Sequence, residues 1–479
     1  MNAALRSLWK NGDSIRRPKP GICESTSSSR AGARTALPIT VFQQTLSLLA
    51  LAISLSLAAG AEHDPAEVLK RVTDKVVTNG RRLPKYTCVE TVTRDFFAPA
   101  AGTPPRACSV LVAQKQPPPD VALRPVMTDR LRLDVTMVVG GEIFSWVGAR
   151  QFDTAGIEHL VRNGPIGTGA FGGFLDVVFR FDAPKITFEK YVLEDGRSLM
   201  EFSFEVLMAN SHYQVKLRDS WVFTGYSGTI QVDPETGDVV RMTVQTGELP
   251  APTGECQSIT TLDFGLTQIG EARFIVPARA RQRFVYRDGQ EVENNTILAN
   301  CRQYRSESTI SFESAPQSVA ARSGERLPES AVVPAGLRFT LELTAPIGAD
   351  TAAAGDPFTA KLPAPLLGEN HKVLARAGSV VEGRLLRVQI SHILPAEVVM
   401  VLKPRTLELN GAQVPFAAVR DWTKVRVANR GKRGVRVALP LQGEEQAGVF
   451  QFKGDHVVVK KGMRSDWQTV DSGEVKKQP

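Results

Sequence analysis

The chain has 479 residues, of which 42% are hydrophobic and 23% charged. These values are typical of globular proteins and exclude a largely disordered chain. The formal net charge is +8, but residues 1–61 contribute +5 of it, so the remainder carries only about +3 and the charge gives no argument for nucleic-acid binding.

The N-terminal segment predicts export. An apolar run covers residues 41–58, basic residues precede it, and Ala59-Gly60-Ala61 follows as a pattern typical of signal-peptide cleavage. We therefore expect residues 1–61 to be a signal peptide with a long N-terminal flank. A retained signal anchor is the alternative, although the run is barely long enough to cross a bilayer.

Four cysteines follow this leader: Cys88, Cys108, Cys256 and Cys301. An even number of cysteines in an exported chain predicts two structural disulfides. The expected pairs are Cys88–Cys108 and Cys256–Cys301, because each pair flanks consecutive strands that would be neighbours. No CxxC occurs, which argues against a zinc site or a redox centre.

The mature chain is predicted to open with a helix at residues 64–79. Asp64 is a good N-cap, Pro65 suits the first helical position, and Glu67 completes a pair that resembles a capping box. The apolar face consists of Val68, Leu69, Val72 and Val76. Gly80 is the expected stop.

A long series of strands is predicted after this helix. The segments are rich in β-branched and aromatic residues or alternate between apolar and polar positions. They comprise residues 86–97, 131–137, 200–206, 229–246 (two strands with a turn at 233–238), 259–266, 272–286 and 306–313. This succession predicts a long antiparallel sheet.

Helical periodicity interrupts the strands between residues 153 and 181. One apolar stripe is formed by Phe171, Phe174, Leu175, Val178 and Phe179. We interpret this stripe as a candidate lid over an apolar cavity, with simple core packing as the alternative.

The same segment contains Gly167-Thr168-Gly169-Ala170-Phe171-Gly172, which has the GxGxxG spacing of dinucleotide-binding loops. Such loops need a preceding strand, whereas residues 153–162 are predicted to be helical. A flexible loop between two helices is therefore favoured over a nucleotide site.

Residues 314–335 are predicted to be a linker, since they contain three prolines and no periodicity. Residues 336–479 are almost entirely strand-like and predict a small all-β barrel domain. Asn410-Gly411 indicates a hairpin between residues 406–409 and 413–416. A second hairpin is expected from residues 449–452 and 456–459.

A basic run without an intervening acid occurs in this second domain. Its members are Lys424, Arg426, Arg430, Lys432, Arg433 and Arg436. A solvated loop is the first interpretation, and contact with an anionic partner such as phospholipid head groups is the alternative.

No catalytic signature is present in the sequence. The six histidines form no HExxH motif, and Gly225-Tyr226-Ser227-Gly228 lacks the final glycine of a GxSxG nucleophile turn. We expect a protein that is not an enzyme and that has no metal site and no cofactor.

Residues 62–313 resemble the outer-membrane lipoprotein-carrier class (LolA/LolB-like). The matching features are the capped helix at 64–79, the strand series, the helical insert at 153–181 and the turn at 233–237. The resemblance implies a half-open antiparallel sheet curled around helices, with a concave face that binds acyl chains.

Residues 334–383 are similar to the TrbI-type barrels of conjugation and secretion scaffolds. The matching elements are residues 347–355, Asp356-Pro357-Phe358, and Ala377-Gly378-Ser379 with Gly383. This resemblance implies a barrel module and supplies no catalytic residue.

The sequence thus predicts an α+β chain, with a curved antiparallel half-barrel and helices at 62–313 and a small all-β barrel at 336–479. We expect an exported bacterial envelope protein in the periplasm or at the outer-membrane periphery, with a lipid or other apolar ligand in the first domain. The alternative is a structural scaffold of the envelope with no ligand cavity. An envelope protein or a membrane surface is the expected partner, and nucleic acid is not.

Overall fold

The structure is a computed structural model that describes residues 63–471 except 105, 114–122, 139–140, 150–151, 154–155, 162–163, 218–219, 305–332, 369–370 and 422–439. The expected signal peptide, most of the expected linker and the expected strand at 306–313 lie outside the described residues. Among the helices that are described, none combines the length and the apolar character needed to cross a bilayer.

The first helix, α2, covers Pro65–Arg82. The predicted N-cap is confirmed, because the Asp64 carboxylate accepts a hydrogen bond from the Ala66 backbone N–H at 3.0 Å. The predicted stop at Gly80 is wrong. The helix continues to Arg82, and Leu83 then adopts extended backbone angles ahead of Pro84, as residues before proline generally do.

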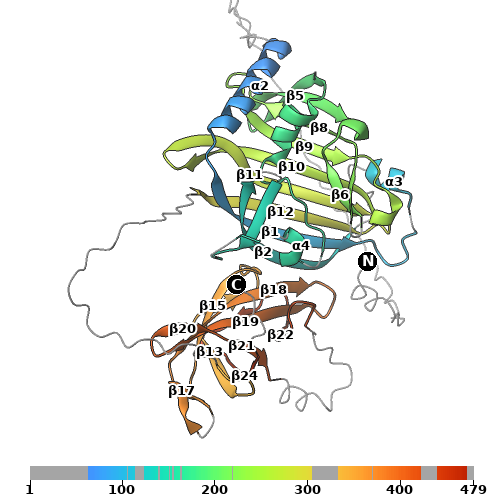
Figure 1. The fold of residues 1–479 in the computed structure, drawn as a ribbon. Coiled ribbons are helices and arrows are strands. Elements are labelled where there is room, and N and C mark those ends of the chain that lie inside the picture. The colour runs from blue at the N-terminus through green and yellow to red at the C-terminus, as the bar shows by residue number, and fades with distance from the viewer. Residues whose placement is uncertain are drawn as a thin grey trace, which may run out of the picture. The chain divides into compact units, whose positions relative to one another are not determined.

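Most of the N-terminal region, residues 63–304, is antiparallel strand. The strands are β1 (Tyr86–Ala98), β2 (Arg124–Val138), β3 (Gly141–Trp146), β4 (Ile186–Glu194), β5 (Arg197–Val206), β8 (Tyr226–Val232), β9 (Val239–Thr246), β10 (Glu255–Ile269), β11 (Ala272–Tyr286) and β12 (Glu291–Gln303). Figure 1 shows them forming a curved sheet.

Hydrogen-bonded neighbours in this region follow the order β3–β2–β1–β12–β11–β10–β9–β8–β5–β4, and every pairing is antiparallel. A separate small hairpin, β6 (Gln214–Leu217) with β7 (Ser220–Phe223), lies between β5 and β8 in the chain. The predicted strand at 272–286 is confirmed with the same bounds, and the predicted hairpin at 229–246 corresponds to β8 and β9.

The predicted helical insert consists of short pieces. They are α4 (Ile157–Leu160), α5 (Gly173–Asp176) and a π-helical turn, η3 (Val177–Asp182). The Gly167–Gly172 segment lies between α4 and α5, so its interpretation as a loop between two helices is confirmed. A further short helix, α3 (Cys108–Ala113), precedes β2.

A hydrophobic core joins α2 and the α5–η3 segment to the strands. Val68 and Val72 of α2 are buried with Phe174 and Val178 of the insert. The strand residues of this cluster include Met200, Phe202, Ile230, Met242 and Leu262. Helix and sheet therefore bury one another's apolar faces, which is the main favourable term in their association.

The four cysteines form two disulfides, but the predicted pairing is wrong. Cys88 pairs with Cys301 and Cys108 with Cys256. The prediction assumed that neighbouring strands are consecutive in sequence. Instead β1 pairs with β12, which brings Cys301 to Cys88, and α3 carries Cys108 to β10.

The C-terminal region, residues 333–471, is also antiparallel. Its strands are β13 (Arg338–Leu343), β14 (Ile347–Gly348), β15 (Pro357–Lys361), β16 (Leu366–Leu367), β17 (Val373–Ala375), β18 (Val380–Ser391), β19 (Glu397–Leu409), β20 (Ala412–Pro415), β21 (Ala417–Arg420), β22 (Gly448–Lys453), β23 (Val458–Val459) and β24 (Arg464–Val470). They surround a core that contains the buried Trp467, Phe450 and Met400.

The strand pairings of this region follow the order β22–β19–β18–β15–β13–β24–β21, and each of them is antiparallel. Because this order does not close on itself, the closed barrel stays a prediction. The hairpin at Asn410-Gly411 is confirmed as β19–β20. The second predicted hairpin is wrong, because β22 pairs with β19 and β23 pairs with β14.

Candidate functional site

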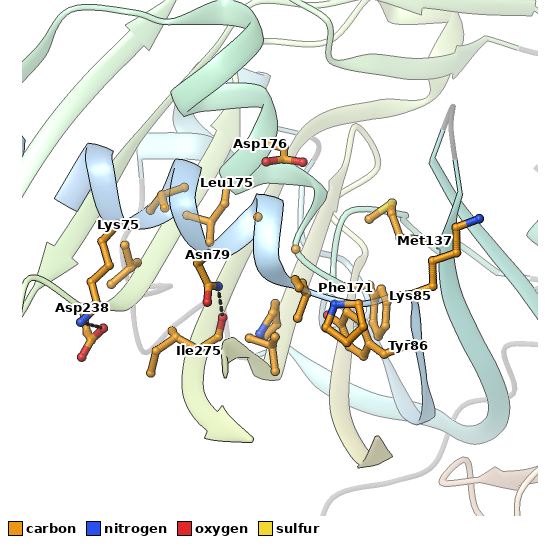
Figure 2. Close-up of a pocket in the computed structure, with 18 of the residues that line it drawn as sticks. Lys75, Asn79, Lys85, Tyr86, Met137, Phe171, Leu175, Asp176, Asp238 and Ile275 are labelled. Atoms are coloured by element: carbon orange, nitrogen blue, oxygen red, sulfur yellow. Dashed lines mark hydrogen bonds and ion pairs between the residues drawn. The ribbon is translucent and has the colours of Figure 1, made fainter. Parts of the chain in front are cut away.

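A cavity of about 270 Å³ lies between the C-terminal half of α2 and the curved sheet. The residues that line it come from α2 and the segment after it, from β1, β2, β9 and β11, from the α5 helix, and from the turn before β9. They are Lys75, Val76, Asn79, Gly80, Leu83, Pro84, Lys85, Tyr86, Met137, Phe171, Gly172, Leu175, Asp176, Gly237, Asp238, Val239, Ile275, Val276 and Pro277. Figure 2 shows most of these side chains.

The lining is mainly apolar, and some of its polar groups are held by contacts between elements. Lys75 Nζ lies 2.5 Å from Asp238 Oδ1, and the Asn79 side-chain amide donates to the Ile275 carbonyl at 3.2 Å. These contacts tie α2 to the turn before β9 and to β11 (Figure 2). The cavity wall is therefore held by interactions between elements that are far apart in the sequence.

The five predicted lid residues divide into two groups. Phe171 and Leu175 line the cavity, whereas Phe174, Val178 and Phe179 are buried in the core. The Phe171 ring is stacked on Tyr86, with 4.6 Å between ring centroids. The segment thus packs into the core on one side and faces the cavity on the other.

A partly buried carboxylate positions the loop that carries Phe171. Glu142 on β3 accepts hydrogen bonds from the backbone N–H groups of Gly169 and Phe171, each at 2.8 Å. Burial raises the pKa of Glu142 to about 7, although these two hydrogen bonds act in the opposite direction. Sheet and loop are therefore joined at this carboxylate.

A second buried acid, Glu90 on β1, lies near Glu142. Its side chain faces the core between Cys88 and Val92 and is 4% exposed. Burial raises the pKa of Glu90 to about 8, and the like charge of Glu142 adds to the shift. Neither acid lines the cavity.

A row of buried polar side chains crosses the sheet beneath the same loop. Strand register places Asp129, Arg94, Asn294, Gln282 and Thr260 side by side on five consecutive strands. Arg94 holds Asp129 through two hydrogen bonds of 2.7 and 2.6 Å. The sheet interior under the loop is thus polar, while the cavity beside it is apolar.

The loop lies close to this polar row. Asn294 donates to the Pro165 carbonyl at 3.1 Å. A Cβ on Gly167 would lie only 2.6 Å from the amide nitrogen of Gln282, so a larger residue there would have to displace the Gln282 side chain. Gly169 and Gly172 have positive φ angles of 100° and 111°, so packing and backbone conformation together account for the three glycines that suggested a phosphate loop.

The far end of the helical segment is held by another carboxylate. Asp182 of η3 accepts a hydrogen bond from the Tyr226 hydroxyl at 2.6 Å and pairs with the His212 ring. Asp182 and Glu142 therefore fix the segment between Gly169 and Asp182 at its two ends.

The basic residues Lys424, Arg426, Arg430, Lys432, Arg433 and Arg436 lie outside the described residues. Within the part of the chain that is described, no cluster of three or more His, Cys, Asp or Glu side chains could hold a metal ion.

Sequence reasoning missed Tyr86, Met137 and Ile275 in the cavity, and Glu90 and Glu142 behind it. Only Glu90 had a local signal, as an acid at an inward position of an otherwise apolar alternation. The others come together through strand pairing across long separations in the chain.

No protein-family model and no curated protein matches this chain. Solved structures with similarity include a LolA superfamily protein from Nitrosomonas europaea, at 9% identity over 50% of this chain and 93% of that chain, with a TM-score of 0.23. An outer membrane lipoprotein-sorting protein domain from Vibrio parahaemolyticus matches at 10% identity over 51% and 95%, with a TM-score of 0.25.

A DUF1329 family protein from Desulfovibrio piger matches at 12% identity over 50% of this chain and 94% of that chain, with a TM-score of 0.23. At these TM-scores the three structures carry no argument about this chain, and the resemblance of residues 334–383 to TrbI-type barrels gains no support.

Proposed function

We propose that residues 62–313 form a non-enzymatic binding domain of an exported envelope protein, and that the domain holds a lipid or another apolar ligand beside α2. The observation that carries the proposal is the apolar cavity of about 270 Å³ between α2, α5 and the sheet. The alternative function, a structural scaffold, implies a filled core and does not explain this cavity.

The size and lining of the cavity favour hydrocarbon. An apolar cavity of roughly 150 Å³ is enough to bind benzene, and larger ligand pockets begin near about 300 Å³. Each methylene buried in such a space contributes about 0.8 kcal/mol. Phe171 and Leu175 present apolar surface to the cavity, so the candidate lid segment also contributes to the ligand site.

The test is direct extraction. The full chain is produced with export, purified without detergent and extracted with organic solvent, and the extract is analysed by mass spectrometry. We expect a lipid in a defined ratio to protein. In parallel, a fluorescent fatty-acid probe is titrated into the delipidated protein and should bind with saturation.

Leu175→Gln is the site variant, because it places an amide in the cavity wall. Leu193→Gln is its matched control, since Leu193 is 77% exposed and does not line the cavity. We expect probe affinity to fall about tenfold or more in Leu175→Gln and to be unchanged in Leu193→Gln. A folded protein that yields no lipid and binds no probe would instead favour the scaffold.

A further inference from the structure

We infer that the ligand of this cavity is a single-chain anionic amphiphile, with its hydrocarbon chain in the cavity and its head group at Lys85. The inference rests on the proposed function and adds to it the number of chains and the sign of the head group. It follows from the cavity volume and from the charges at its edge.

The volume limits the ligand to one chain. At about 270 Å³, the space is less than twice the roughly 150 Å³ that holds one benzene ring. It also lies just below the range of about 300–1,000 Å³ that is usual for drug-sized ligands. One acyl chain of moderate length fits this space, and a lipid that must bury two or three chains does not.

The charges of the lining leave one cation without a partner. Four charged residues line the cavity: Lys75, Lys85, Asp176 and Asp238. Lys75 pairs with Asp238 at 2.5 Å, and Asp176 accepts from Arg180 at 3.2 Å. Among the described residues, no hydrogen bond or ion pair involves the Lys85 ammonium, and the residue is exposed.

Two more exposed cations lie next to Lys85 in the chain. Arg81 and Arg82 form the last turn of α2, between the cavity-lining residues Gly80 and Leu83. Their favourable interaction with the helix C-terminus accounts for their presence there. Lys85 lies beyond the helix, so that explanation does not extend to it.

The positions of these groups orient the ligand. Figure 2 shows Lys85 beside Tyr86 and Phe171, whereas Lys75 and Asp238 lie at the other end of the cavity. With its head group at Lys85, the ligand would extend its hydrocarbon chain past Phe171 and Leu175. The chain would then point toward the end of the cavity where Lys75 pairs with Asp238. A carboxylate and a phosphate monoester share the required chemistry.

The test compares head groups on one chain length. Dodecanoate, dodecyl phosphate, dodecanol and dodecyltrimethylammonium, each below its micelle concentration, displace a fluorescent probe from the delipidated full-length protein. We expect both anions to bind at least tenfold more tightly than the cation, with dodecanol between them. The ratio of dodecanoate to dodecyl phosphate distinguishes a fatty acid from a phospholipid-derived source.

Lys85→Glu should weaken binding of both anions about tenfold and strengthen binding of the cation. Lys70→Glu is the control, because Lys70 is an exposed lysine of α2 that does not line the cavity. Dodecanol reports whether the variant still folds and binds a chain, since it has no charge.

The two proposals fail in different ways. If none of the four compounds binds and the exported protein yields no lipid on extraction, the proposed function is wrong. If all bind with equal affinity, or if Lys85→Glu behaves as Lys70→Glu does, the cavity binds a chain but the inference about its head group is wrong. Tighter binding of a two-chain anionic lipid than of dodecanoate overturns the inference of a single chain.

Discussion

The Glu142 carboxylate accepts a hydrogen bond of 2.8 Å from the backbone N–H of Phe171, and this bond joins the sheet to the cavity wall. Glu142 belongs to β3, whereas Phe171 lies in the loop before α5 and has its ring on Tyr86. The loop has no strand pairing of its own. Its position therefore depends on polar contacts to side chains of the sheet and on the burial of Ala170 and Phe171 in the core.

Glu142→Ala should destabilise the protein and loosen the ligand site together. Two partly buried N–H groups lose their acceptor, and each loss costs up to about 1–3 kcal/mol. We expect a lower urea midpoint and weaker probe binding. Glu205→Ala, at an exposed position of β5, is the control and should change neither quantity. If Glu142→Ala destabilises the protein but leaves probe binding unchanged, the position of this loop does not affect the ligand site.

Stability should fall as the pH rises from about 5 to 8, because Glu90 has a raised pKa of about 8 in the folded protein, against an ordinary value of 4.5. Between these values the unfolded chain has lost a proton that the folded chain retains, so unfolding becomes easier by up to about 1.4 kcal/mol per pH unit. Glu142 acts in the same direction up to about pH 7.

Glu90→Gln isolates this contribution. The neutral amide resembles the protonated acid, so the variant and the wild type should differ little in urea unfolding at pH 5. At pH 8 the variant should be the more stable protein. A difference between the two that is the same at both pH values would show that Glu90 does not titrate in this range.

Local patterns in the sequence predicted the elements that have a strong periodicity. Helix α2 was found from Asp64 and its apolar stripe, and β11 from its alternation and length. β12 was not found, because Asn294, Asn295 and Asn300 give it little strand character. Its place between β1 and β11 depends on cross-strand contacts that no local window contains.

The disulfide error has the same origin. The expected pairing of Cys88 with Cys108 assumed that strands close in sequence are neighbours in space. Instead β12 pairs with β1, and it brings Cys301 to Cys88 across a sequence separation of 213 residues. The candidate lid was predicted in part, because Phe171 and Leu175 belong to a visible stripe. The cavity's other walls could not be predicted, since they meet only through the sheet.

Peptide mapping checks the disulfide pairing. Proteolysis of the oxidised protein without reductant should give cross-linked peptides that join Cys88 to Cys301 and Cys108 to Cys256. The double variant Cys108→Ser with Cys256→Ser should lose about 2–5 kcal/mol of stability to urea. A peptide that joins Cys88 to Cys108 would support the pairing expected from sequence and contradict the fold of β1 against β12.

Gly448→Ala tests the packing of the C-terminal core. A Cβ at Gly448 would overlap the ring of Trp467, which is 1% exposed and cannot move toward solvent. Overpacking of this kind costs about 1–3 kcal/mol. Gly247→Ala is the matched control, because a Cβ there meets no atom within 4 Å. We expect Gly448→Ala to lower the urea midpoint and to shift Trp467 fluorescence, while Gly247→Ala changes neither. Equal stability of both variants would mean that β22 does not pack against Trp467, since a close contact cannot accept an added methyl group without cost.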